Sequence, residues 1–324
     1  MRFYISKCHD RLNGSPYRPE KHGEYLCINP YYKVTVRGKS TKFIIDSGAF
    51  QDVGNETRLT FEKALKRQLE FEKTVTKDSR PAEAIVSYDR LVDEQMGESG
   101  QFKARVSAEE SITYVKETID AAKFLVSKRE ELKPRRLILS CQGTTVDQYL
   151  DCLREILDIA SPEDIIGFGG FCIISKNREY EKQFYEVVYR GFPMIREKGI
   201  IRVHIFGVGM FRSLIQAEIC AQLNGIVCSY DTSSCEINSV YGKVFDPLNA
   251  MLVSVYQKEQ KKNGYVPAEL AEFNVKSILQ FWKHFSQLPL PESFIPGLVE
   301  RPKNDKPKKV KKIKGEMIVD EPKD

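Results

Sequence analysis

Residues 137–169, LILSCQGTTVDQYLDCLREILDIASPEDIIGFG, hold two short apolar runs on either side of an amphipathic stretch. The runs Leu137–Gln142 and Ile165–Gly169 have the composition of buried β-strands. Residues 145–160 have the apolar spacing of a helix, and Thr145-x-x-Gln148 marks its start. A strand, a helix and a second strand in this order form a parallel βαβ unit. The stretch therefore predicts an α/β fold.

The same alternation continues in both directions from this unit. Further apolar runs that predict strands lie at Phe3–Ser6, Phe43–Asp46, Ala84–Asp89, Ile201–Gly207 and Gly225–Asp231. Amphipathic stretches that predict helices lie at 60–75, 107–132, 178–198, 211–223, 246–262 and 268–287. Seven strands are visible in this pattern, and we expect an eighth in the less regular C-terminal third. The pattern favours a (β/α)8 TIM barrel over an open doubly wound sheet.

Two segments depart from the alternation. Residues 10–40 contain several Gly, Pro and Tyr residues and predict an irregular loop. Within it we expect a hairpin that pairs Tyr32–Val36 with Lys42–Ile45 across Arg37-Gly38. Residues 299–324 are lysine-rich and predict a disordered tail. The expected organisation is therefore a barrel over residues 1–298 followed by this tail.

The composition bounds the class of protein. The chain has 324 residues, of which 41% are hydrophobic and 29% charged, and these values are typical of a globular protein with a substantial core. No run approaches the roughly 18 apolar residues that a membrane helix needs, and the N-terminal MRFYISKCHD has no apolar signal region. The eight cysteines form no CxxC pair, which is typical of reduced thiols. We expect a cytoplasmic protein without a membrane partner.

Positive charge is concentrated in the lysine-rich tail. Residues 303–314, KNDKPKKVKKIK, hold seven lysines and one aspartate, so their net charge is +6, compared with +5 for the whole chain. The rest of the chain is then close to −1. One interpretation is a solubilising tail. The other is non-specific attraction to nucleic-acid phosphates by Lys306, Lys308, Lys309, Lys311 and Lys312.

Polar residues gather where the expected strands end, which is the catalytic face of a TIM barrel. The relevant segments are FIIDSGAFQ (43–51), AIVSYD (84–89), LILSCQG (137–143), IIGFGG (165–170), IFGVG (205–209) and VCSYDTSS (227–234). Asp46 and Asp231 each end an apolar run, where a lone aspartate is often a helix N-cap. Two carboxylates at one barrel mouth can instead act as nucleophile and acid/base in cleavage of a glycosidic bond.

Other strand ends are suited to holding a planar purine. Asp89 can accept two N–H bonds from the N1 and 2-amino edge of guanine, although a salt bridge with Arg90 is the structural alternative. Gln142 offers a donor to a carbonyl oxygen, or an amide that satisfies loop backbone. Gly169 and Gly170 can expose a backbone N–H at close approach to a ligand, although Gly pairs are also common in turns.

Taken in order, these motifs resemble the tRNA-guanine transglycosylase superfamily, whose members are (β/α)8 barrels. DSGAFQ at 46–51 resembles that family's DSGGFQ, with Ala49 in place of a glycine. SYD at 87–89 is similar to its FDE, CQG at 141–143 to its VQGG, GFGGF at 167–171 to its IGGL, and FGVG at 206–209 to its MGVG. SYDTSS at 229–234 is closer to the archaeal FDSAS than to the bacterial DCVLPTR.

The resemblance implies a role for each matched residue. Asp231 would be the nucleophile that attacks C1′ of a nucleotide and displaces guanine, and Asp46 the neighbouring acid/base, although which of the two attacks is left open. Asp89 would bind the N1/N2 edge of the base, and Gln142 with the backbone at Gly169 and Gly170 would hold O6. Ser47 and Gln51 of DSGAFQ would complete the base-binding set. A 7-deazaguanine such as preQ0 would then enter and reform the glycosidic bond, without ATP or a redox cofactor.

The chain also departs from the family. Members carry a zinc site after the nucleophile, built from CxC, CxxC and a distant His, whereas only Cys235 and His284 follow Asp231 here. Cys8, His9, His22 and Cys27 offer zinc-ligand types, but their spacing fits no standard pattern. We therefore expect no metal cofactor. The missing zinc module, the short chain and the lysine tail resemble most the branch that modifies DNA in bacteria and phages.

Alternative functions stay open at this point. A tRNA-guanine exchange enzyme would use the same chemistry on another polynucleotide. A non-catalytic nucleic-acid-binding paralogue would keep the barrel without the reaction, and an unrelated sugar-phosphate barrel enzyme would need a glycine-rich phosphate cradle, of which Gly207–Gly209 is a poor version. A homodimer or an accessory protein that opens DNA would also be compatible with the sequence.

Overall fold

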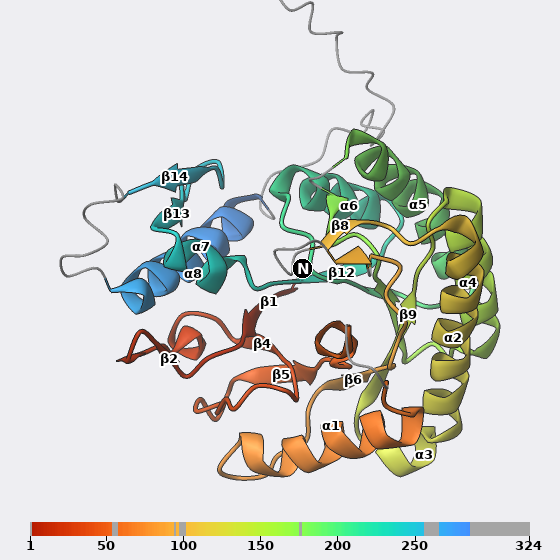
Figure 1. Ribbon diagram of the computed structural model, residues 1–324, viewed down its shortest axis with the longest axis horizontal. Helices are drawn as coiled ribbons and strands as arrows, with labels where there is room; N and C mark the ends of the chain where they lie inside the picture. Colours follow the sequence, from red (N-terminus) through yellow and green to blue (C-terminus); the bar gives the residue numbers. More distant parts are fainter. Residues whose placement is uncertain are drawn as a thin grey trace, which may run out of the picture.

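The computed structural model describes residues 2–53, 58–93, 95–96, 102–174, 177–255 and 266–285. Eight parallel strands form a closed barrel in the order β1-β12-β11-β10-β9-β6-β5-β4 (Figure 1). The strands are β1 Arg2–Lys7, β4 Tyr25–Ile28, β5 Lys42–Ile45, β6 Ala84–Val86, β9 Arg136–Cys141, β10 Ile165–Phe168, β11 Arg202–Ile205 and β12 Val227–Thr232. Helices surround this barrel, so the protein is an α/β chain with a TIM-barrel fold, as the strand–helix alternation predicts.

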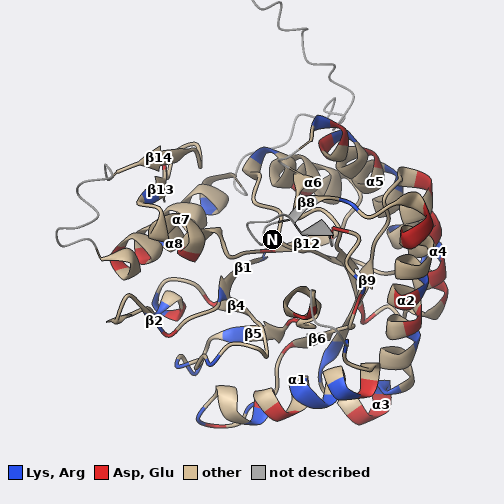
Figure 2. Ribbon diagram, in the orientation of Figure 1, with Lys and Arg blue, Asp and Glu red and all other residues tan. Residues whose placement is uncertain are grey.

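The helices after strands β5 to β11 cover the outside of the barrel (Figure 1). They are α1 Phe61–Val75, α2 Ala108–Ser127, α3 Arg129–Leu132, α4 Val146–Ile159, α5 Arg178–Glu197 and α6 Phe211–Leu223. Local sequence fixes where several of them begin. Ser107 and Glu110 form the predicted capping box of α2, and Thr145 accepts a hydrogen bond from the Gln148 N–H at the start of α4. Acidic positions are conspicuous along α4 (Figure 2).

The first two connections of the barrel contain no α-helix among the described residues. The chain between β1 and β4 forms the short strands β2 Arg11–Leu12 and β3 Ser15–Pro16 and the 3-10 helix η1 Pro19–Lys21. The C-terminal helix α8, Pro267–Phe285, covers β1 in their place. Its Trp282 stacks on Tyr230 of β12 with ring centroids 5.3 Å apart and lies 5.8 Å from the ring of Phe3. This aromatic contact fixes the helix over the two strands that close the barrel.

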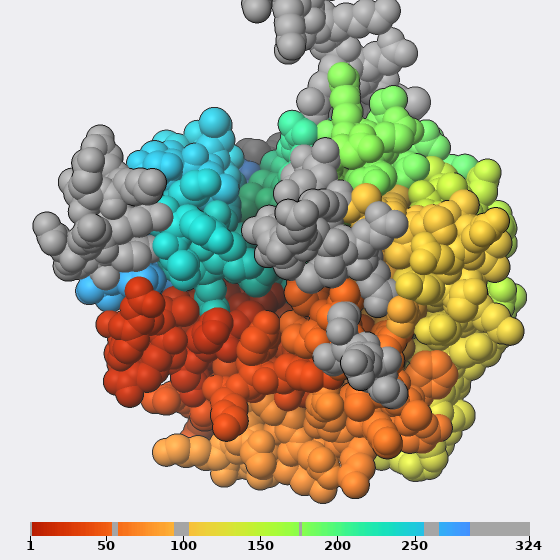
Figure 3. Space-filling view, in the orientation of Figure 1, coloured from red at the N-terminus to blue at the C-terminus, as the bar shows by residue number. Residues whose placement is uncertain are grey.

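A small C-terminal unit lies beside the barrel, at the left of Figure 1. It consists of α7 Ser234–Val240, β13 Lys243–Phe245, β14 Leu252–Ser254 and α8. The buried Asn274 of α8 accepts the Phe245 N–H and donates to the carbonyl oxygens of Cys235 and Lys243. One side chain thereby ties α8 to α7 and β13. The space-filling view shows this unit in contact with the N-terminal segments of the chain (Figure 3).

Two more short segments follow barrel strands at their carboxyl ends. The 3-10 helix η2, Ala49–Asp52, comes directly after the Asp46 strand, and the two-stranded β7 Gln95–Met96 and β8 Phe102–Ala104 follow β6. Within the described ranges, no helix is long and apolar enough to cross a membrane.

Three expectations about local structure are wrong. The eighth strand lies at Tyr25–Ile28 rather than in the C-terminal third, and it runs parallel to β5 with Leu26 opposite Phe43. The hairpin of Tyr32–Val36 with Lys42–Ile45 therefore does not form, because β4 takes the edge of β5, and Val36 bridges Thr76 instead. β4 is only four residues long. Its apolar run is too short to be recognised as a strand in the sequence of the surrounding loop.

The predicted helix over 246–262 is also wrong, because residues 252–254 within this range form strand β14. The predicted helix over 107–132 is divided, since α2 ends at Ser127 and α3 begins at Arg129. The tail over 299–324, with Lys306, Lys308, Lys309, Lys311 and Lys312, lies outside the described residues.

Gly143 sits where β9 turns into α4, and the packing there leaves no room for a side chain. A Cβ at this position would lie 2.6 Å from the backbone nitrogen of Tyr149 and 2.7 Å from its Cα. Because these are backbone atoms of α4, they cannot rotate out of the way. Glycine therefore allows α4 to approach the end of β9.

We expect Gly143→Ala to lower the free energy of unfolding by about 1–3 kcal/mol through this overpacking. Chemical denaturation of the full chain measures the loss. Gly23→Ala is the matched control, because its Cβ would meet side-chain atoms rather than backbone, Leu279 Cδ1 at 3.2 Å and Ile5 Cγ1 at 3.9 Å. Equal effects of the two substitutions would contradict the close approach at Gly143.

Candidate active site

Asp46 follows β5 directly and lies among amide and hydroxyl groups from the neighbouring loops. Its Oδ2 accepts a 2.8 Å hydrogen bond from Asn29 Nδ2, and its Oδ1 accepts the Ser47 N–H at 2.8 Å. Asn29 also donates to Gln51 Oε1 at 2.6 Å, and Gln51 Nε2 donates to the Tyr32 hydroxyl. Two residues of the predicted DSGAFQ set, Ser47 and Gln51, are therefore directly or indirectly connected to Asp46.

The pKa of Asp46 is raised to about 7. Burial is the largest cause, because it disfavours the charged carboxylate, and the negative charges of Asp231 and Asp89 follow. Asp46 is thus poised to exchange a proton near neutral pH. The charge of Asp231 thus acts on Asp46. Burial is the main cause that raises the pKa of the Cys27 thiol on β4, and Asp231 and Asp46 add to it.

Asp231, on β12, is held by donors from both neighbouring strands. Ser6 Oγ of β1 donates to Oδ2 at 2.8 Å. On the other side, the Gly207 N–H after β11 donates to Oδ1 at 3.0 Å, and His204 Nε2 lies 3.3 Å from the same oxygen. Asp231 is 8% exposed. These contacts fix the orientation of the carboxylate.

His204 was not predicted as a site residue. It is fully buried inside the barrel, with Nδ1 2.9 Å from Ser229 Oγ and its ring packed edge-on against Tyr4 and Phe206. Its Nε2–H can donate to Asp231, whereas the Ser229 hydroxyl beside Nδ1 donates to the Val203 carbonyl oxygen at 3.1 Å. The signal in the sequence is a histidine within an otherwise apolar strand end, RVHIFG at 202–207.

Asp89 and Gln142 form a second buried group, as the purine-binding hypothesis expects of neighbouring strand ends. Gln142 Nε2 donates a short hydrogen bond to Asp89 Oδ2, and Ser47 Oγ donates to Oδ1 at 3.2 Å. Burial raises the pKa of Asp89. Gln142 is completely buried, and its Oε1 accepts the Val92 N–H at 2.9 Å. Its amide therefore orients Asp89 in this structure. A salt bridge with Arg90 was the structural alternative for Asp89, and it is not among the ion pairs of the described residues.

Gly169 and Gly170 lie directly against Gln142. Gly169 donates its N–H to the Cys141 carbonyl oxygen, so that this donor is already used. Gly170 has a φ of +75°, and a Cβ there would lie 2.9 Å from Val92 Cγ2. Among the described residues its N–H has no acceptor. Of the two glycines, Gly170 is therefore the one that can offer a backbone donor to a ligand.

Arg105 fixes the Gly170 loop and was also not predicted. Its guanidinium donates to the Gly170 carbonyl oxygen at 2.9 Å and to the Thr144 carbonyl oxygen at 3.1 Å. Asp93 lies 3.4 Å from its Nε and accepts the Cys172 N–H. The pair connects the segment after β6 with the loop after β10, although Arg105 and Gly170 are 65 residues apart in the chain.

A family-type zinc site does not fit these residues. Cys235 is completely buried in the core, whereas His284 lies exposed on α8, so the two residues that follow Asp231 face different environments. The N-terminal ligand types are also engaged elsewhere, since His9 pairs with Glu236 and His22 with Glu272. In the part of the chain that the structure describes, no three metal-ligating side chains are grouped to hold an ion.

Comparison with known proteins does not assign the chain to a family. No protein-family model matches it, and no curated protein matches it either. The function is therefore argued from the geometry of the site.

The electrostatic coupling of the two aspartates makes a measurable prediction. In a ¹³C-NMR titration of carboxyl groups, we expect Asp46 to titrate at about pH 7. Asp231→Asn removes a negative charge, so the pKa of Asp46 should fall. Asp158→Asn is the control, because this exposed carboxylate pairs with Lys198 on the outside of the barrel. An unchanged Asp46 midpoint in Asp231→Asn would mean that the two carboxylates do not interact.

Proposed function

We propose that the protein is a transglycosylase that exchanges guanine in a polynucleotide for a 7-deazaguanine such as preQ0, through a covalent aspartyl-nucleotide intermediate. One observation carries the proposal: two carboxylates interact at the barrel mouth but have different environments. Asp231 is held by Ser6, His204 and Gly207, whereas the pKa of Asp46 is raised to about 7. Carboxylates with separated properties are suited to divide the roles of nucleophile and acid/base.

In the first step, an Asp231 oxygen attacks C1′ of the target nucleotide. A bond forms between this oxygen and C1′, the bond from C1′ to N9 breaks, and guanine departs with the electron pair and takes a proton from Asp46. In the second step, Asp46 accepts the N9 proton of the incoming base, whose N9 attacks C1′ and releases the Asp231 carboxylate. Asp46 thus returns to its starting state, and the exchange requires no ATP or redox cofactor.

The hydrogen bonds to Asp231 favour it as the nucleophile. They keep the carboxylate in one orientation, while the raised pKa of Asp46 suits that residue to carry the proton. They also limit the rotation of the side chain, which reduces the entropy lost when the oxygen approaches C1′. His204 acts here as a positioning residue, because it contacts Asp231 rather than the substrate.

Asp89 is the residue that we propose reads the base. Guanine presents N1–H and a 2-amino group side by side, and one carboxylate accepts both. In the free protein Ser47 and Gln142 donate to the two Asp89 oxygens, so guanine would compete with or rearrange these donors. The Gly170 N–H would bind O6. Adenine has an acceptor at N1 and no 2-amino group, and would leave Asp89 unpaired.

DNA is the polynucleotide that we favour, and tRNA is the alternative with the same chemistry. The net charge of +6 in residues 303–314 supports attraction to phosphates but does not separate the two. In either polymer the target base must leave its stack to reach a residue as enclosed as Asp231. We place the reaction in the cytoplasm of a bacterium or a phage-infected cell.

The test is incorporation of labelled guanine or preQ0 into duplex DNA, single-stranded DNA and bulk tRNA, offered in parallel to the full chain. We expect Asp231→Asn to reduce incorporation at least about 10³-fold, since the covalent route is lost. A covalent protein–polynucleotide adduct, resolved on a denaturing gel, should form with the wild type and be absent in Asp231→Asn. Incorporation into tRNA alone would overturn the choice of DNA, and activity retained by Asp231→Asn would overturn the mechanism.

Base selection gives a separate prediction. We expect Asp89→Asn to raise the KM for guanine about 10- to 100-fold, because the amide cannot accept both N–H groups. Competition between guanine and hypoxanthine, which lacks the 2-amino group, measures the selectivity. Asp158→Asn on the outer surface is again the control. If Asp89→Asn discriminates between the two bases as well as the wild type does, Asp89 does not read the 2-amino group.

A further inference from the structure

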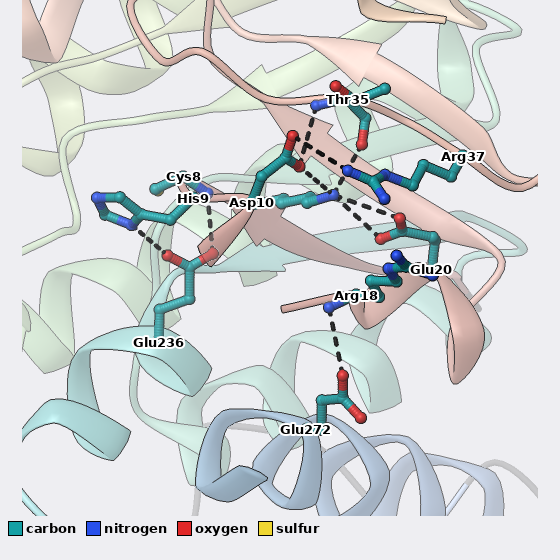
Figure 4. A network of polar contacts seen from close by, with 10 residues as sticks. Cys8, His9, Asp10, Arg18, Glu20, Thr35, Arg37, Glu236 and Glu272 are labelled. Carbon is teal, nitrogen blue, oxygen red and sulfur yellow. Dashed lines mark hydrogen bonds and ion pairs between the residues drawn. The ribbon is translucent and has the colours of Figure 1, made fainter. Parts of the chain in front are cut away.

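His9 lies just beyond β1, at the same end of the barrel as the two aspartates. Its Nδ1 is 2.7 Å from Glu236 Oε2, and the other oxygen of Glu236 accepts the Cys8 N–H at 2.9 Å (Figure 4). Glu236 belongs to the first turn of α7, which directly follows the strand of Asp231. The pair thus joins the chain after β1 to the chain after β12, next to the Ser6–Asp231 hydrogen bond.

The geometry of this pair leaves one nitrogen of His9 for a ligand. Glu236 is almost completely buried, whereas the His9 side chain is 56% exposed. Because Nδ1 is bound to Glu236, Nε2 is the ring nitrogen that remains available as a donor. The hydrogen bond to Glu236 is the main cause that raises the pKa of His9. The other titratable groups against it are Tyr32, whose ring is 5.9 Å away, and the adjacent Cys8, a buried thiol.

Negative charge around the barrel mouth makes a cation there useful. Glu236 accepts the Cys8 N–H and Asp231 accepts the Ser6 hydroxyl, so two carboxylates flank the end of β1. A phosphodiester that approaches this region is repelled unless a positive group faces it. Lys7 does not serve, because its ammonium is buried between Asp10, Glu20 and the Thr35 carbonyl oxygen.

We propose that His9, oriented by Glu236, donates its Nε2–H to a backbone phosphate of the polynucleotide beside the nucleotide that undergoes exchange. His9 is three residues beyond Ser6, a span of roughly 10 Å in extended chain. It is therefore within one or two nucleotides of a sugar held at Asp231. The contact would position the strand without reading its sequence. The identity of the polymer rests on the proposed function, whereas the phosphate contact is common to DNA and RNA.

The experiment measures binding rather than catalysis. Labelled single-stranded DNA and tRNA are titrated with the full chain in the Asp231→Asn background, over a series of salt concentrations and between about pH 6 and about pH 9. We expect His9→Gln to weaken binding several-fold at the lower pH and to reduce the slope of log Kd against log salt by about 0.7 for a single strand. Binding by the Asp231→Asn chain that keeps His9 should weaken as the pH rises and His9 loses its proton. The variant that also carries His9→Gln should lose this pH dependence.

Two further variants make the test specific. Glu236→Gln keeps an acceptor for the Cys8 N–H but removes the charge, so the pH at which binding weakens should move downward. His22→Gln is the matched control, because His22 also pairs with a glutamate, Glu272, but its Nε2 is occupied by that contact and its side chain is only 18% exposed. His22→Gln should leave the salt slope and the pH dependence unchanged.

An unchanged salt slope and pH dependence in His9→Gln would overturn the inference, as would failure of the chain to bind either polymer. If the wild-type chain exchanges no base although binding depends on His9, the proposed function is refuted and the phosphate contact stands. Comparison of the DNA and tRNA titrations identifies which backbone His9 contacts.

Discussion

The hydrogen bond from Ser6 to Asp231 spans the seam at which the barrel closes. β1 is the first strand in the chain and β12 the last strand of the barrel, and they pair in parallel with Tyr4 opposite Asp231. Asp231 receives its other donors, Gly207 and His204, from β11 on the opposite side. The carboxylate proposed as nucleophile is therefore oriented only when three strands lie side by side. Closure of the barrel and assembly of the site are the same event.

The charge of Asp231 acts on Asp46. Burial first, and then the charges of Asp231 and Asp89, make ionisation of Asp46 less favourable. The two carboxylates also differ in their partners, because Asp231 is held by Ser6, Gly207 and His204, whereas Asp46 has an amide from Asn29 and the backbone of Ser47. Different surroundings thereby separate the properties of two chemically identical side chains, as the proposed mechanism requires.

Much of this architecture was predictable from the sequence. Strand–helix alternation indicated the barrel, because the apolar runs and amphipathic stretches are long enough to be recognised by their period. The polar strand ends indicated Asp46, Asp89, Gln142 and Asp231. Ser47 contacts Asp46 and Asp89, Gln142 contacts Asp89, and the charge of Asp231 acts on Asp46. β4 was not predicted, since four apolar residues carry no usable period.

The groups that orient the site were harder to find for a different reason. His204 and Arg105 act through contacts with residues distant in the chain. The only local signal is the histidine in the apolar strand end at 202–207, and the segment of Arg105 carries none. Gln142 was expected to face the ligand, but its amide is used to hold Asp89 and the Val92 N–H. Which hydrogen-bond partner a buried amide chooses depends on the packed neighbours, and these are fixed only by the tertiary fold.

The stack of Trp282 on Tyr230 has a consequence for how the chain is made. A growing chain emerges from the ribosome N-terminus first, so β1 leaves long before the strand and the helix that flank it. Until residues 227–285 have been synthesised, β1 lacks β12 on one edge and α8 on its outer face. The exposed apolar strand is a ready substrate for chaperones or for pairing with another nascent chain. Production of this protein should therefore depend on the rate of translation through its last third.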